Sequence, residues 1–192
     1  MHKHKAIFFD KDGVLNKDTG VNPRLTETEL YPETGETIAY CRKRGFLTII
    51  VTNQPIVARG IIDEATLNEK IGQYQRMILE QDEHALIDRV YYCPHHPNAT
   101  VERYRINCEC RKPKPGMLLQ ASQELEIDLR NSYMVGDRIS DIIAGKLAGC
   151  MTIQCLTGSH NEKMIETDFK IDFRVEPDYF IYSVGELKNI IS

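Results

Sequence analysis

Residues 8–16 read FFDKDGVLN, and this stretch gives the clearest indication of the fold. An apolar run that starts at Ala6 has the length of a β-strand and stops at Asp10. Asp12 follows two residues later, and Gly13 permits a sharp turn. Asp and Gly are also common in ordinary turns after strands. Two carboxylates this close repel each other unless a cation or a shared proton compensates, so their place at a strand end favours a chemical site.

The rest of the chain repeats the pattern of a short apolar run followed by a helix-like stretch. Near-continuous apolarity favours strands that are covered on both faces. Further strands are expected at 46–52, 89–93, 132–137, 150–155 and near 178–182. Helices are expected at about 33–44, 63–83, 115–126, which Pro115 opens as the first helical position, and 139–148, with a closing helix after the last strand. This alternation predicts an α/β, Rossmann-like fold: a parallel sheet with helices on both faces.

Ligands of such sheets bind beyond the carboxyl ends of the strands, where Asp10, Thr52, Cys93 and Asp137 are expected. Asp137, in the segment MVGDRISD, can share a hard cation with Asp10, and carboxylate oxygens of this kind suit Mg²⁺. Asp141, one helical turn further on, is either an exposed helix residue or a support behind the site. Thr52 taken alone also reads as an ordinary β-branched strand residue.

Length and composition indicate an ordinary globular protein. The chain has 192 residues, of which 42% are hydrophobic, and we expect one domain that spans residues 1–192. A net charge of −4 without long runs of like charge argues against a nucleic-acid partner. The apolar run near the N-terminus is too short for a signal peptide or a membrane span, so a cytoplasmic protein with no membrane partner is expected. No pattern specifies an interface, and we expect a monomer.

Half of the six cysteines gather with histidines in the segment 93–110. Cys93, His95, Cys108 and Cys110 supply a full tetrahedral set for Zn²⁺, with no position left for a substrate, which indicates a structural site. His96 is the alternative nitrogen ligand, although alternation with Cys93 favours His95. A disulfide between Cys108 and Cys110 would close a very small, strained ring in a reducing compartment, so this alternative ranks low. The remaining three cysteines, each beside apolar residues, are expected to be buried: Cys41, Cys150 and Cys155.

Four motifs in order, Asp10-Lys11-Asp12-Gly13, Thr52, Lys112 and Gly136-Asp137, resemble the haloacid dehalogenase superfamily of phosphatases. The resemblance implies that Asp10 attacks phosphorus and that Asp12 acts as general acid and then as general base. It also implies Mg²⁺ held by the carboxylates of Asp10 and Asp137 and by the backbone carbonyl of Asp12. Thr52 and Lys112 would bind the other phosphoryl oxygens. Lys112 taken alone would read as a solvated surface charge.

Longer matches resemble one branch of that superfamily. The segments are DKDGVLN, VTNQ with ARG after it, YYCPHHP, CECRKPKPGM, YMVGDRISD and LTG. They are similar to the D-glycero-D-manno-heptose 1,7-bisphosphate 7-phosphatases, which act in nucleotide-activated heptose biosynthesis for glycans such as lipopolysaccharide, and imply a sugar bisphosphate as the substrate. Histidinol-phosphate phosphatases are similar but usually have a shorter loop between their cysteine pairs. They, or a phosphatase of another small sugar phosphate, are the alternative, and a non-enzymatic, zinc-clipped binding module is a remote one.

The same resemblance implies the substrate contacts. Arg111 and Arg138 would meet anionic or hydroxyl groups, and the planar fork of Arg111 suits a phosphate best. Arg138 can equally be a solvated charge at a helix start. The sugar would lie against Asp18, Thr19, Gly20 and Val21, and the transferring phosphate against Thr52, Asn53, Gln54 and Pro55. Asp18 and Gly20 can equally form an ordinary turn. The family usually has Ser-Gly where this chain has Pro55-Ile56, and because Pro55 has no N–H, a backbone contact at that point is in doubt.

Two spacings complete the expectation. The gaps from Asp12 to the first helix and from Thr52 to Lys112 are too short for a separate cap domain, so the loops must shape the pocket. Cys110 is joined directly to Arg111 and Lys112, with Pro113 and Pro115 behind them. The zinc loop is therefore predicted to fix where these two cations point.

Overall fold

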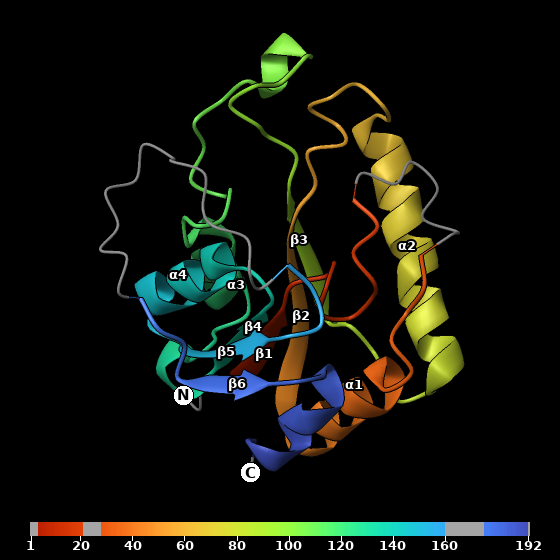
Figure 1. Ribbon diagram of the computed structural model, residues 1–192, viewed down its shortest axis with the longest axis vertical. Helices are drawn as coiled ribbons and strands as arrows, with labels where there is room; N and C mark the ends of the chain where they lie inside the picture. Colours follow the sequence, from red (N-terminus) through yellow and green to blue (C-terminus); the bar gives the residue numbers. More distant parts are fainter. Residues whose placement is uncertain (1–3, 21–27, 160–174, 192) are drawn as a thin grey trace.

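The computed structural model describes residues 4–20, 28–159 and 175–191. The described residues form a parallel six-stranded sheet in the order β3-β2-β1-β4-β5-β6 (Figure 1). The strands are β1 (Lys5–Phe9), β2 (Phe46–Asn53), β3 (Arg89–Cys93), β4 (Tyr133–Gly136), β5 (Met151–Cys155) and β6 (Tyr179–Ile181). Each lies within a residue or two of its predicted position. The predicted α/β fold with a parallel sheet is confirmed.

The helices also follow the predicted order. They are α1 (Thr34–Lys43), α2 (Glu64–Gln81), α3 (Gly116–Glu124) and α4 (Ile139–Ala148), with 3₁₀ segments η2 (Glu102–Tyr104), η3 (Leu129–Asn131) and η4 (Val184–Asn189). Two details differ from the expectation. Pro115 is the N-cap of α3 rather than its first helical residue, and the closing helix is the 3₁₀ segment η4. None of the described helices has both the length and the hydrophobicity that a bilayer crossing requires.

From Ala6 to Phe9, strand β1 is apolar and buried on both faces. Ile7 and Phe9 belong to the core that α1, α2 and η4 cover, whereas Ala6 and Phe8 belong to the core under α3 and α4 (Figure 1). Burying an Ile or Phe side chain contributes about 1.5–3 kcal/mol to stability. A third, smaller cluster joins α2 to the segment after β3 through Leu67 and Tyr104.

The strand order places the end of β1 at the centre of the sheet. Phe9 is in register with Ile50 of β2 and Val135 of β4, and the Asp10 N–H donates to the Val135 carbonyl at 2.8 Å. From β1 the chain builds the sheet first toward β3 and then, starting at β4, toward the opposite edge. Ligands of such sheets bind at this switch point between β1 and β4. Between β1 and α1 the described residues form only isolated bridges, and between β2 and α3 they form α2, β3 and η2. Neither described segment contains a cap domain, as expected.

Candidate active site

Lys112 and the carboxyl group of Asp10 meet at the centre of the sheet edge. The ammonium of Lys112 lies 2.7 Å from Asp10 Oδ1 and 2.7 Å from Asp141 Oδ1, and donates to the Val51 carbonyl at 2.8 Å. Lys112 is 4% exposed and Asp141 is 1% exposed. Lys112 is therefore a buried ionic partner rather than a solvated charge, and Asp141 lies inside the site rather than on an exposed helix face.

The buried charges shift one another's pKa values. Burial raises the pKa of Asp10 to about 7, although the Lys112 ammonium opposes that shift. Burial also raises the pKa of Asp137 to about 8, and the neighbouring carboxyl groups of Asp10 and Asp141 add to it. For Lys112, burial favours the neutral amine, but the carboxylates of Asp10 and Asp141 outweigh it and raise its pKa. The acidic groups outnumber the cation that they surround, so the cluster favours a further positive charge.

The donor set fits a hard metal ion. One carboxylate oxygen from each of Asp10, Asp137 and Asp141 lies within 4.8 Å of the others. Asp137 Oδ1 is buried and has no hydrogen-bond partner among the described residues. Asp137 Oδ2 accepts from Ser159 N at 2.6 Å and is enclosed by Gly13 and Gly158, where a Cβ atom would collide with it. A rigid, oxygen-lined site of this kind suits Mg²⁺.

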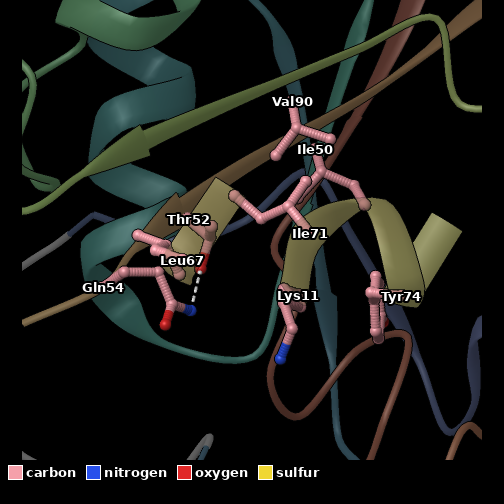
Figure 2. A pocket seen from close by; sticks show the side chains of 8 residues that line it. All are labelled: Lys11, Ile50, Thr52, Gln54, Leu67, Ile71, Tyr74 and Val90. Carbon is pink, nitrogen blue, oxygen red and sulfur yellow. Dashed lines mark hydrogen bonds between the residues drawn. The ribbon is translucent and has the colours of Figure 1, made fainter. Parts of the chain in front are cut away.

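The side chain of Asp12 is fixed by three donors from different parts of the chain. Lys11 Nζ and Asn16 Nδ2 donate to Asp12 Oδ1 at 2.5 and 2.9 Å, and Gln54 Nε2 donates to Oδ2 at 3.2 Å. Gln54 also donates to Thr52 Oγ1 at 3.1 Å, and Figure 2 shows this hydrogen bond together with the side chain of Lys11. Asp12 is therefore held at the same edge as Thr52. Asn16 was not predicted as a site residue, because an Asn in a loop carries no distinguishing pattern.

The end of β2 is linked to the segment that carries Lys112. Asn53 Nδ2 donates to the Lys112 carbonyl and Asn53 Oδ1 accepts from the Lys112 N–H, both at 3.1 Å. The Asn53 amide thus connects two segments 59 positions apart. At the next turn, Pro55 offers its carbonyl, which accepts from Arg59 N at 3.0 Å, and Ile56 is 6% exposed in the third core cluster.

Asp18 and Arg138 lie together on the other side of the site. Arg138 Nη2 donates to Asp18 Oδ2 at 2.9 Å and to Ser159 Oγ at 3.3 Å, and Gly20 N donates to Asp18 Oδ1 at 2.8 Å. Burial opposes ionisation of Asp18, but the hydrogen bonds from Gly20 and Arg138 prevail and lower its pKa. Arg138 is therefore an ion-pair partner at the start of α4, with its side chain 43% exposed. Thr19 lies in the same turn, and Val21 falls outside the described residues.

The four predicted zinc ligands form one cluster. Cys93 Sγ lies 3.5 Å from Cys108 Sγ, Cys110 Sγ lies 3.2 Å from both, and His95 Nδ1 lies 3.4 Å from Cys110 Sγ. These separations are too long for a disulfide, whose S–S bond is about 2.05 Å. They are close to those around tetrahedral zinc with Zn–S bonds of about 2.3 Å. Hydrogen bonding from Cys93 lowers the pKa of Cys110.

Hydrogen bonds around the cluster show that His95, and not His96, lies among the sulfur atoms. His96 Nδ1 accepts from Asn98 N at 3.0 Å, in a turn beside the sulfur atoms rather than among them. Arg111 Nη1 donates to the His95 carbonyl at 3.0 Å. The residue that follows Cys110 is thus tied back to a member of the cluster, and the next residue, Lys112, reaches Asp10.

Comparison with known proteins matches this chain to phosphatases of the haloacid dehalogenase-like family. The HAD-hydrolase-like family model matches residues 109–187. A curated D-glycero-beta-D-manno-heptose-1,7-bisphosphate 7-phosphatase from Pasteurella multocida is 38% identical over 97% of this chain and 96% of its own length. The enzyme of the same name from Escherichia coli K12 is 41% identical over 77% of this chain and 76% of its own length.

A solved structure extends the similarity to the fold. The D,D-heptose 1,7-bisphosphate phosphatase from B. bronchiseptica, complexed with magnesium and phosphate, superposes with a TM-score of 0.80 at 27% identity and covers 97% of both chains. The resemblance drawn from the sequence motifs is therefore confirmed. The chain belongs to the haloacid dehalogenase-like hydrolases, in the family of D-glycero-β-D-manno-heptose 1,7-bisphosphate 7-phosphatases.

Proposed function

We propose that this protein is a Mg²⁺-dependent phosphatase that removes the 7-phosphate of D-glycero-D-manno-heptose 1,7-bisphosphate in nucleotide-activated heptose biosynthesis. The observation that carries the proposal is the Asp10–Lys112 pair at the point where the sheet order reverses, with Asp12, Thr52 and Asp137 around it. The relatives that match nearly the whole chain carry this activity in their names. In the proposal, the enzyme is a cytoplasmic monomer that consists of one domain.

The proposed reaction has two steps. In the first, the Asp10 carboxylate attacks phosphorus, the bond between phosphorus and the sugar oxygen breaks, and Asp12 gives its proton to the departing alkoxide. In the second, Asp12 takes a proton from water, which attacks the aspartyl-phosphate and releases inorganic phosphate. The hydrogen bonds that fix Asp12 beside Thr52 support this division of roles. The proton from water replaces the one that left with the sugar, and the Asp10 carboxylate is restored when its bond to phosphorus breaks, so the reaction is balanced.

The remaining charged groups hold the phosphate. The Asp10 and Asp137 carboxylates and the Asp12 backbone carbonyl would hold Mg²⁺, which when bound supplies positive charge between the anionic nucleophile and the anionic phosphate. The Lys112 ammonium and the Thr52 hydroxyl would bind phosphoryl oxygens as charge shifts toward them. The orphaned Asp137 Oδ1 supports the metal assignment.

The cysteine cluster is proposed as a structural zinc site. Cys93, His95, Cys108 and Cys110 leave no open ligand position for a substrate. Bound zinc would fix the start of the segment that carries Arg111 and Lys112. The bond from Arg111 to the His95 carbonyl supports this role.

Substrate recognition is proposed to use loops on two sides of the phosphate. The sugar would meet Asp18, Thr19 and Gly20, with Arg138 held beside them by its ion pair. Val21 belongs to the same proposal. Arg111 would bind an anionic group. The transferring phosphate region would lie against Thr52, Asn53, Gln54 and Pro55, although the Asn53 amide is already bonded to Lys112.

The test is a comparison of substrates. Zinc-replete protein with added Mg²⁺ is expected to release phosphate from heptose 1,7-bisphosphate with a kcat/KM at least tenfold above that for histidinol phosphate. A preference for histidinol phosphate would assign the chain to the alternative phosphatase. No release from any phosphomonoester would leave the zinc-clipped binding module as the better description.

A matched pair of variants tests the nucleophile. Asp10→Asn is expected to abolish turnover while the protein stays folded, because an amide cannot form the phosphoryl intermediate. Glu83→Gln makes the same change of charge on a side chain that is 87% exposed and should leave the rate unchanged. Retained turnover in Asp10→Asn would exclude Asp10 as the nucleophile.

A further inference from the structure

Tyr74 of α2 lies beneath the turn that carries Asp12. It is 2% exposed, and its hydroxyl donates to Asn16 Oδ1 at 2.8 Å. Asn16 is 1% exposed and donates through Nδ2 to Asp12 Oδ1 at 2.9 Å. A chain of two hydrogen bonds, of which the first is buried and the second partly buried, therefore joins the helix to the proposed general acid. None of the assigned roles uses Tyr74.

The direction of these hydrogen bonds is fixed by their surroundings. Asn16 Nδ2 also donates to the Lys17 carbonyl at 2.8 Å, so the amide nitrogen faces Asp12 and the amide oxygen faces Tyr74. The Tyr74 hydroxyl must then be the donor to that oxygen. Burial raises the pKa of Tyr74, and the negative charges of Asp12 and Asp10 raise it further. The hydroxyl therefore keeps its proton.

The ring of Tyr74 reaches the other donor to Asp12. Lys11 Nζ lies 4.9 Å from the centroid of the Tyr74 ring, and the two side chains are neighbours in Figure 2. The same ammonium donates to Asp12 Oδ1. One tyrosine thus supports both groups that hold this carboxylate oxygen, through its hydroxyl and through its π-face.

We propose that Tyr74 is a positioning residue, which acts through Asn16 and Lys11 to hold Asp12 with Oδ1 turned inward and Oδ2 presented toward the leaving oxygen of the substrate. Oδ1 accepts two hydrogen bonds from this support, so Oδ2 is the oxygen that carries the transferable proton. Oδ2 lies on the side of Gln54 and Thr52, where the phosphate is expected. The inference rests on the proposed function of Asp12 and deepens it.

A positioning role predicts a particular pattern in the kinetics. An alkoxide departs slowly without a proton, whereas p-nitrophenolate is stable as an anion and departs without one. Poor alignment of the acid should therefore slow cleavage of a sugar phosphate much more than cleavage of p-nitrophenyl phosphate. The comparison uses kcat/KM, which reports the steps up to departure of the leaving group.

Tyr74→Phe removes the hydroxyl and keeps the ring. We expect kcat/KM for the sugar bisphosphate to fall by about tenfold, a part of the 10²–10⁴ that general acid catalysis contributes, with kcat/KM for p-nitrophenyl phosphate within about threefold of wild type. The loss should appear in kcat rather than in KM, because Tyr74 does not contact the substrate. Tyr74→Leu also removes the ring beneath Lys11 and should widen the difference between the two substrates.

Two controls separate positioning from stability. Tyr91→Phe removes a hydroxyl that donates to Glu124 at 2.7 Å, away from Asp12, and should leave the ratio of the two kcat/KM values unchanged. In an Asn16→Ala background, Tyr74→Phe should have little further effect on that ratio, because the route from Tyr74 is already broken. Asn16→Ala alone carries the test if Tyr74→Phe does not fold.

The outcomes are distinct from those of the proposed function. An active wild-type enzyme whose ratio is unchanged in folded Tyr74→Phe and Asn16→Ala overturns the positioning role. An equal loss on both substrates, in step with a lower melting temperature, overturns it as well and assigns Tyr74 to the core alone. An inactive wild-type protein would instead contradict the phosphatase assignment on which the inference rests.

Discussion

The carboxyl groups of Asp10 and Asp137 show how much the site depends on a cation that the chain does not supply. Lys112 is shared between Asp10 and Asp141, and Asp137 Oδ1 is left without a partner among the described residues. Burial is the first cause of the raised pKa of both groups. Burial therefore favours the protonated forms of these acids below about pH 7, and a bound metal ion would favour their ionised forms.

This arrangement predicts the pH dependence of stability in Mg²⁺-free, zinc-replete protein. The Asp10 and Asp137 carboxyls titrate near 3.8 when unfolded and at about 7 and 8 when folded. Between these values the folded chain binds more protons, so the free energy of unfolding falls as pH rises, by roughly 1.4 kcal/mol per pH unit for one such group. The stabilisation is complete below about pH 4 and lost as pH passes 7 to 8.

Urea denaturation from pH 5 to pH 8 measures this slope. Asp137→Asn removes one of the titrating groups and should flatten it. Added Mg²⁺ should raise the midpoint more at pH 8 than at pH 5, because ionised ligands bind the metal. A midpoint that stays constant over this range without Mg²⁺ would contradict the prediction.

Individual residues differ in how far the sequence could identify them. Asp10 and Asp12 stand out because they follow the end of an apolar strand. Asn16 and Tyr74 do not, since one is a polar residue in a loop and the other an aromatic residue on a helix, 58 positions apart. Only the folded chain brings that pair together. The link between Asn53 and Lys112 is equally invisible in the sequence, because it depends on the path of the segment 93–110.

At the scale of elements, the strands were the most predictable part. Each central strand is buried on both faces, and this requirement leaves a continuous apolar run in the sequence. The end of the chain was less predictable. The segment after β6 forms 3₁₀ turns that pack Val184 and Leu187 into the core, and a short amphipathic segment does not distinguish these from an α-helix.

The cysteine loop can be tested as an element. Cys110→Ser is expected to lose zinc, to lower the melting temperature and to reduce turnover, because the cluster anchors the segment that begins at Arg111. In a chain of this length each kcal/mol of lost stability lowers the melting temperature by about 2–4 °C. Metal analysis, thermal melting and phosphate release measure the three effects.

Cys150→Ser is the matched control. Cys150 is 6% exposed beneath α3 and α4 and does not belong to the cluster, so this change should keep zinc bound. If Cys110→Ser were zinc-free yet fully active, and melted at the wild-type temperature, the anchoring role would be wrong.

At the scale of the whole molecule, the proposed single domain predicts one cooperative transition. Two of the core clusters lie on opposite faces of the same sheet, and the third is attached to it through α2. Unfolding of the helices on one face alone would expose the strands that both large clusters share. Scanning calorimetry of the zinc-replete protein should show one peak with equal calorimetric and van't Hoff enthalpies. Two resolved peaks would contradict the single domain.

The glycines around Asp137 also determine which substitutions the protein can accept. Gly13 and Gly158 come from loops after β1 and β5, and a single added carbon at either position would meet the Asp137 carboxylate. Gly45 has open space around the same added atom. In a library that samples every position, replacements of Gly158 should therefore be depleted for reasons of space alone, although glycine has no functional group. Positions without a functional group thus also limit the evolution of this site.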